Sequence, residues 1–151
     1  MKTLIRLLVL VFLFLSCCKP NTPIKTAKVS GGIVEGVISG EISIFKGIPF
    51  AAPPIGDYRW KPPQPVKPWA GTLKADKFGP QCPQINLDMK DTTRIESSED
   101  CLYLNVWTPA KSTKEKLPVM VWIYGGGFAI GRTSHPWYNG ENLAKMGVIV
   151  I

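Results

Sequence analysis

Apolar and polar residues alternate over the first part of the chain that follows its leader. From Val29 to Phe45 the apolar positions recur at every second residue and are interrupted at glycines. Side chains two positions apart lie on the same face of a strand, so this alternation predicts strands with one buried face. The break at Ser39-Gly40 is typical of a tight turn, and we therefore expect a hairpin of short strands here.

The last fifty residues predict a second group of elements. Leu102 to Thr108 alternates and carries β-forming residues, and Val119 to Ile123 is a short apolar run bounded by a proline and glycines. The first predicts a strand and the second a buried strand. Glu141 to Met146 predicts a short helix that ends near Gly147, and Val148 to Ile151 predicts the start of another strand. This order favours an α/β sheet covered by helices.

The stretch from Pro49 to Pro83 holds most of the chain's prolines. Proline excludes a helix interior or a central strand, so we expect an extended segment that crosses the surface. Four aromatic residues would anchor it, which distinguishes it from a disordered linker. They are Tyr58, Trp60, Trp69 and Phe78.

The first sixteen residues predict a signal peptide. Lys2 and Arg6 precede an unbroken apolar run, Leu7 to Leu15, which is too short for the roughly 20 residues that a membrane-spanning helix requires. Phe14-Leu-Ser-Cys17 is similar to a bacterial lipoprotein cleavage site, with Cys17 as the lipidated residue. Cleavage before Cys18, or an ordinary signal peptide that ends in cysteines, are the alternatives.

Residues 17–28 are polar, contain prolines and predict a tether between an anchor and a domain. We therefore expect an exported protein that is lipid-anchored to a bacterial membrane, or that is otherwise periplasmic or secreted.

The net charge of +7 does not indicate a nucleic-acid partner, because the basic residues are scattered among acidic ones and form no stripe. A metal site is not expected either. His135 is the only histidine, and the cysteines form no Cys-x-x-Cys pair.

The segment with the clearest chemistry is Pro118-Val-Met-Val-Trp-Ile-Tyr-Gly-Gly-Gly-Phe128. Glycines directly after a buried strand let the backbone turn sharply and remove every Cβ that would keep a ligand away. Successive backbone N–H groups can then point into one small space, which is how an enzyme holds an oxyanion. A plain flexible turn is the alternative when such a triplet stands alone.

The triplet is accompanied by Ser98-Glu-Asp-Cys-Leu-Tyr-Leu-Asn-Val-Trp107. Together, the two segments resemble the type B carboxylesterases, the family that includes cholinesterases and bacterial p-nitrobenzyl esterases. Three further motifs agree in the same order: Phe45-Lys-Gly-Ile-Pro-Phe-Ala51, then Gly56-Asp-Tyr-Arg-Trp60 with Pro65-Val-Lys-Pro-Trp69, then Tyr138-Asn-Gly140 with the run that ends at Ile151. The resemblance covers nearly all of the chain after the leader.

The resemblance implies an α/β-hydrolase fold, with residues 29–151 as its N-terminal portion, truncated at 151. In this family the nucleophilic serine lies on a Gly-x-Ser-x-Gly turn. The serine, the acidic residue and the histidine all follow the glycine triplet. Residues 1–151 contain no such turn, and His135 comes too early to be the base. We therefore expect these residues alone to be inactive.

The resemblance also assigns site residues. Backbone N–H groups of Gly126 and Gly127 are the implied oxyanion donors, Gly125 serves the turn, and Tyr124 and Phe128 belong to the substrate pocket. For Phe128, ordinary core packing remains the alternative.

Two structural pairs complete these assignments. In an exported chain Cys82 and Cys101 are an even pair, and in the family the second of them closes a disulfide loop, although two free thiols remain the alternative. Such a loop would contribute about 3 kcal/mol. Arg59 and Glu99 match a family ion pair that braces this loop, and we expect that pair to be buried; solvent-exposed charges that contribute little are the alternative.

The implied activity is hydrolysis of a small-molecule carboxylic ester through a serine ester, with no metal or organic cofactor. The cholinesterases that the chain resembles place a tryptophan in the disulfide loop, where it stacks on quaternary ammonium. Pro83 to Asp100 contains no aromatic residue, so the resemblance disfavours choline esters. The competing hypotheses are a non-catalytic cholinesterase-like binding or adhesion protein, as the neuroligins are, and an inactive truncated remnant.

Overall fold

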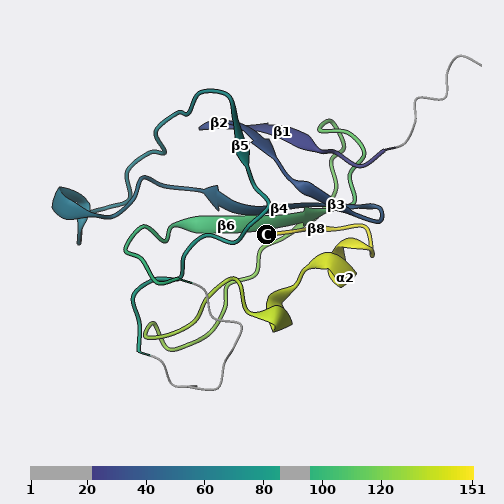
Figure 1. Ribbon diagram of the computed structural model, residues 1–151. Helices are drawn as coiled ribbons and strands as arrows, with labels where there is room; N and C mark the ends of the chain where they lie inside the picture. The colour runs from purple at the N-terminus through teal and green to yellow at the C-terminus, as the bar shows by residue number, and fades with distance from the viewer. Residues whose placement is uncertain (1–21, 86–95) are drawn as a thin grey trace, which may run out of the picture.

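The computed structural model describes residues 22–85 and 96–151 and contains two sheets (Figure 1). The predicted signal peptide (1–16), Cys17 and the first residues of the tether lie outside this part of the chain.

A three-stranded sheet comes first, in the order β1-β2-β5. β1 (Thr26–Val29) and β2 (Gly32–Glu35) form an antiparallel hairpin, and β5 (Thr72–Lys74) pairs parallel to β2. Glu35 of β2 binds Lys74 of β5 and Lys25, the residue before β1, because its carboxylate accepts from Lys74 at 2.5 Å and from Lys25 at 3.0 Å. These two ammonium groups hold the pKa of Glu35 below its usual value.

A mixed five-stranded sheet follows, in the order β3-β4-β6-β8-β7. β3 (Val37–Ser39) and β4 (Ile42–Pro49) are antiparallel, with Ser39 opposite Ile42, so the hairpin turn predicted at Ser39-Gly40 is confirmed. β6 (Tyr103–Thr108) confirms the strand predicted there and pairs antiparallel to β4.

The last strands form a crossover unit. β7 (Val119–Met120) pairs parallel to β8 (Ile149–Val150), and η2 (Pro136–Tyr138) and α2 (Glu141–Ala144) connect them. Gly147, with φ +92°, lies in the left-handed region just beyond the helix, as its predicted stop required. Glu141 fixes the helix to the β3–β4 turn, because its carboxylate accepts from Ser39 Oγ at 3.1 Å.

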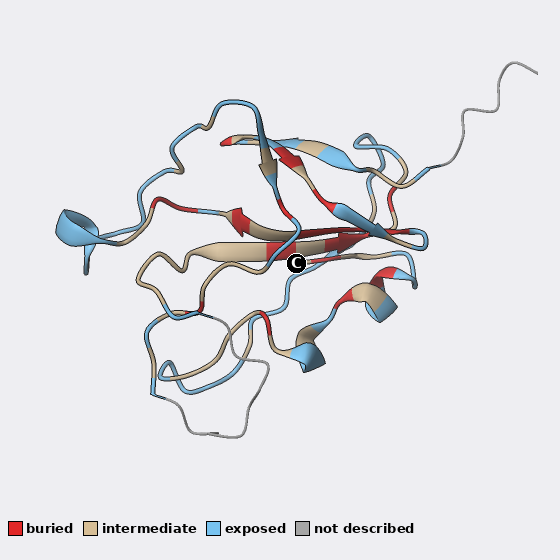
Figure 2. Cartoon of the chain, in the orientation of Figure 1, coloured by how far each residue is buried: buried red, intermediate tan, exposed pale blue. Residues whose placement is uncertain are grey.

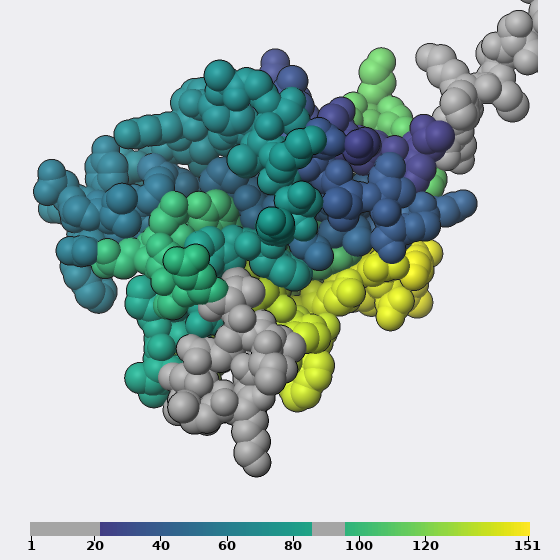
Figure 3. Space-filling model, viewed as in Figure 1, coloured from purple at the N-terminus to yellow at the C-terminus, as the bar shows by residue number. Residues whose placement is uncertain are grey.

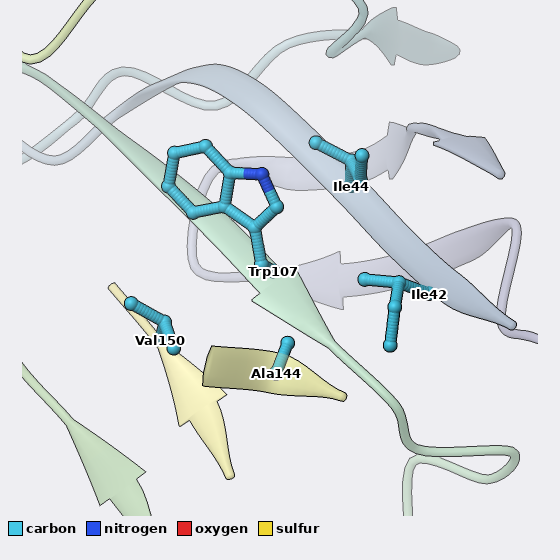
Figure 4. Close-up of a cluster of buried hydrophobic side chains, with 5 residues drawn as sticks. All are labelled: Ile42, Ile44, Trp107, Ala144 and Val150. Carbon is cyan, nitrogen blue, oxygen red and sulfur yellow. The ribbon is translucent and has the colours of Figure 1, made fainter. Parts of the chain in front are cut away.

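The core lies on both faces of β4, which is why Figure 2 shows this strand as mostly buried. Alternation along the strand sends Ile42 and Ile44 to one face and Phe45 to the other. On the first face they pack with Trp107, Ala144 and Val150, the cluster drawn in Figure 4. On the second face, Phe45 and Ile48 pack with Val34 and Ala75 beneath the three-stranded sheet.

The proline-rich stretch is mainly extended, and in the space-filling view its residues lie along the upper edge of the molecule (Figure 3). Two of its four predicted anchors do pack: Trp69 against the second cluster and Phe78 against the first. The prediction is wrong for Tyr58 and Trp60. Tyr58 ends the 3₁₀ turn η1 (Gly56–Tyr58) and Trp60 lies two residues later; both are exposed, Trp60 fully.

The strand predicted at Val119–Ile123 is shorter and more exposed than expected. Only Val119 and Met120 belong to β7, and the five side chains are 43 to 85% exposed. The reason is position: among the described residues, β7 is an edge strand with β8 as its one strand partner. Apart from the contact between Trp122 and Tyr138 of η2, the described elements leave this run uncovered, so its apolar character does not produce burial.

Candidate functional site

The glycine loop, defined here as residues 124–131, starts where the pairing of β7 with β8 runs out. Trp122 N–H donates to Ile151 O at 2.7 Å, and Ile151 N–H donates to Met120 O at 2.9 Å, so the ladder continues past the strand ends. The loop therefore lies at the carboxyl ends of two parallel strands. This is the edge of an α/β sheet where ligand sites are commonly found.

Two glycines give the loop its shape. Gly126 has φ +131° and Gly127 has φ +61°, values that residues with a Cβ rarely adopt. Gly126 O accepts from Ala129 N–H at 3.1 Å and from Ile130 N–H at 3.2 Å, which closes a tight turn. A Cβ at Gly126 would come within 1.8 Å of Ile130 O, whereas one at Gly125 would meet nothing within 4 Å. The sequence therefore has a strict requirement for glycine at 126.

A pocket of about 840 Å³ opens beside this loop. The three glycines line it on one side, and the disulfide segment around Cys82 and Cys101 lines it on another. Most of the remaining lining is apolar, including Leu104, Trp107 and Val121.

Tyr124 and Phe128 both line this pocket. Phe128 has φ +60° and its side chain is fully exposed, so it stands at the pocket margin and does not pack into a core. Tyr124 stacks on Tyr138, with ring centroids 6.4 Å apart, and Trp122 leans on the same ring at 5.6 Å. This aromatic group fixes the residues that precede the glycines.

His135 lies near these rings but has a local structural contact. Its Nδ1 accepts from Trp137 N–H at 3.3 Å and so caps η2, and its ring meets Trp137 edge-on at 4.9 Å. The same ring lies 5.4 Å from that of Tyr138.

The predicted disulfide between Cys82 and Cys101 is confirmed, with the two Cα atoms 5.1 Å apart. Backbone pairing extends the link, because Gln81 N–H donates to Glu96 O at 3.0 Å and Ser98 N–H donates to Gln81 O at 2.9 Å. The two ends of the disulfide loop are thus held together by covalent and hydrogen bonds.

Arg59 and Glu99 lie together, as a bidentate pair with Arg59 Nε and Nη2 at 2.6 and 2.5 Å from the two carboxylate oxygens. The pair is not buried as expected: the side chains are 56% and 41% exposed. The Arg59 guanidinium lowers the pKa of Glu99, but solvent screens an exposed pair of this kind. Arg59 follows the turn η1 directly, and neither residue of the pair belongs to the two hydrophobic clusters.

Sequence reasoning missed Gln84. Its amide Nε2 donates to Gly131 O at 2.8 Å and to Cys82 O at 3.0 Å, and its Oε1 accepts from Gly131 N–H at 2.7 Å. A single glutamine in a loop carries no sequence signal, because two of its three bonds are to backbone groups of Gly131, forty-seven positions away.

Within residues 22–85 and 96–151, no cluster of three or more histidine, cysteine or acidic side chains is placed to hold a metal ion. The same part of the chain has no helix with the length and apolar character needed to cross a bilayer.

The chain is similar to known esterases in sequence and in structure. A model of the carboxylesterase family matches residues 19–151. The fumonisin B1 esterase of Sphingopyxis macrogoltabida is 49% identical over 80% of this chain and 22% of its own length. The para-nitrobenzyl esterase of Bacillus subtilis is 43% identical over 80% of this chain and 25% of its own.

Solved structures agree. A PNB esterase structure superposes on this chain with a TM-score of 0.76 at 41% identity. The superposed region covers 83% of this chain and 26% of the PNB esterase chain. A thermophilic PNB esterase gives 0.75 at 40% identity. The chain therefore spans about a quarter of the length of the relatives that it matches.

Proposed function

The chain belongs to the carboxylesterase family and has part of the family's α/β-hydrolase fold, and from this premise we propose that its protein is a serine carboxylesterase. Residues 29–151 form the N-terminal portion of the catalytic domain in this proposal. The reaction is hydrolysis of a carboxylic ester through an acyl-serine intermediate.

The observation that carries the proposal is the glycine loop on the pocket wall. The N–H groups of Gly126 and Gly127 are the oxyanion donors, and they bind the ester oxygen as it gains negative charge. Support comes from the positive φ angles, the tight turn at Gly126 and the position of both residues in the pocket lining. Backbone donors held in this way need no reorganisation when the charge develops.

Residues 1–151 contain no Gly-x-Ser-x-Gly turn, and His135 is occupied in capping η2. The serine, its general base and the orienting acid are therefore assigned to sequence beyond Ile151. Without them, residues 1–151 supply the oxyanion side of the site and have no turnover of their own.

We propose a small-molecule carboxylic ester as the substrate, with an acyl or alcohol part that suits a largely apolar pocket. The names of two relatives, a fumonisin B1 esterase and a para-nitrobenzyl esterase, point to esters other than choline esters. No cofactor enters the mechanism.

We also propose export, with a lipid anchor on Cys17. Support comes from the basic and apolar leader and from the cysteine that follows it. The Cys82–Cys101 disulfide fits an oxidising compartment. Metabolic labelling with a radioactive fatty acid, compared between wild type and Cys17→Ser, tests the anchor; equal labelling of the two would overturn it.

The experiment that tests the enzyme proposal begins with the nucleotide sequence after the codon for Ile151. The proposal expects an open frame that encodes Gly-x-Ser-x-Gly. The protein from that frame should hydrolyse p-nitrophenyl acetate and be labelled by a fluorophosphonate at that serine. A frame with the serine replaced would favour the binding-protein alternative, and a stop at codon 152 would indicate an inactive remnant.

A further inference from the structure

The side-chain amide of Gln84 pairs with both backbone polar groups of Gly131, the last residue of the glycine loop. It donates to Gly131 O and accepts from Gly131 N–H, at 2.8 and 2.7 Å. Its second amide hydrogen goes to Cys82 O at 3.0 Å. Both donor hydrogens and one acceptor site of this side chain are therefore used, and two of the three bonds cross between separate segments.

Gly131 is the residue at which the glycine loop closes on itself. Its φ is +128°, and a Cβ there would lie 2.5 Å from the Tyr124 ring and 2.9 Å from Gly125 O. The end of the loop thus lies directly against its beginning. Anything that fixes the Gly131 peptide also fixes the backbone that leads into Gly126.

The other side of the pairing is rigid. Gln84 lies two residues after Cys82, which is bonded to Cys101. Leu102 follows Cys101 and leads into β6, and its carbonyl oxygen accepts from Phe50 N–H of the neighbouring chain segment at 3.1 Å. A continuous connection therefore runs from the central sheet through the disulfide and Gln84 to the glycine loop.

We propose that Gln84 is a positioning residue for the oxyanion hole, acting through Gly131 on the N–H groups of Gly126 and Gly127. The inference rests on the proposed esterase function. Gln84 does not need to touch the substrate in this role. It keeps the donors aligned with the place where negative charge forms, so its loss should lower kcat and leave KM nearly unchanged.

The test uses the complete protein and three variants. Gln84→Leu removes all three hydrogen bonds at similar size and should lower kcat about 10- to 100-fold, the scale of a misplacement of about 1 Å. Gln64→Leu is the matched control, because Gln64 is an exposed glutamine bonded only locally, to Pro62 O at 2.8 Å. Its kcat should equal that of wild type.

Gln84→Glu provides a readout that a purely structural role would not move. A carboxylate can accept from Gly131 N–H but repels Gly131 O, whereas a protonated carboxyl can donate and accept as the amide does. The ratio of its kcat to the wild-type kcat should therefore rise as pH falls through the pKa of the introduced carboxyl. A ratio that does not change with pH would overturn the proposal.

Hydrogen exchange separates failure of this inference from failure of the esterase proposal. In Gln84→Leu, the amides of residues 125–131 should exchange faster than in wild type, whether or not the protein is an esterase. Inactive wild-type protein would overturn the proposed function alone. Unchanged exchange, a kcat within twofold of wild type, or equal losses in kcat and melting temperature for both leucine variants would overturn the role of Gln84.

Discussion

The side-chain amide oxygen of Asn105 accepts a hydrogen bond from Gly47 N–H at 3.0 Å, at the point where β4 and β6 lose register. Asn105 is only 4% exposed. Gly47 has φ +67°, and a Cβ there would come within 2.6 Å of Lys77 O. The irregularity in the central sheet therefore depends on one buried amide and one glycine.

Asn105→Leu should lower the free energy of unfolding by about 1–3 kcal/mol, because it leaves the partly buried Gly47 N–H without this partner. Urea denaturation followed by tryptophan fluorescence measures the loss. Asn139→Ala is the control: that side chain accepts from Glu141 N–H at 3.0 Å but is exposed, so its loss should be smaller. Equal losses for the two variants would contradict the assigned role of Asn105.

Gly126→Ala should reduce ester turnover by about 100- to 1000-fold in the complete protein, the scale of a lost oxyanion donor. The added Cβ would collide with Ile130 O and force the loop to move. Gly125→Ala is the matched control, because its Cβ has open space and its backbone is not in the left-handed region. Steady-state kinetics on p-nitrophenyl acetate measures the turnover of both variants. Equal losses of activity in the two variants would contradict the role assigned to Gly126.

Replacing Cys82 and Cys101 together by alanine should cost about 3 kcal/mol, since the disulfide restricts the unfolded chain. The double variant should also match wild type treated with a reducing agent. Comparison of urea midpoints checks both statements. A midpoint unchanged by either treatment would mean that the bond does not stabilise the fold.

The pKa of Tyr103 is raised from the usual value of 10 to about 12. The larger cause is burial of the Tyr103 ring, and the second is a hydrogen bond with Asp100. The unfolded chain loses this proton first, so the contribution of Tyr103 to stability is complete below pH 10 and is lost between pH 10 and about 12. Absorbance at 295 nm should show one late-titrating tyrosine, absent in Tyr103→Phe and retained in Tyr58→Phe. A late step that persists in Tyr103→Phe would refute the assignment.

The sequence predicted best those features that depend on neighbours along the chain. The turn at Ser39-Gly40 and the strand ending at Thr108 follow from alternation, because the pleat repeats every two residues. The helix at Glu141 and its stop near Gly147 follow from local end signals. The motif around Cys101 predicted a disulfide by resemblance, and the structure contains it.

Features that depend on distant partners were not predictable in this way. β5 lies inside the proline-rich stretch and is a strand because β2, far away in the sequence, lies beside it. Apolar composition made Trp60 and Ile123 candidates for burial, but burial requires a facing element, and no described one covers them. Gln84 was missed for the same reason, because its partner is a backbone peptide that only the folded chain brings near.

The exposed edge strand β7 has a practical consequence for handling the protein. Among the described residues β7 is an edge strand: its apolar side chains are exposed and the backbone N–H and C=O groups on its outer side have no strand partner. Such an edge can pair with a strand of another molecule. A polypeptide made of these residues alone should self-associate in solution, and light scattering should rise with its concentration. Recombinant work on the pocket is therefore better begun with the whole reading frame than with an excised piece.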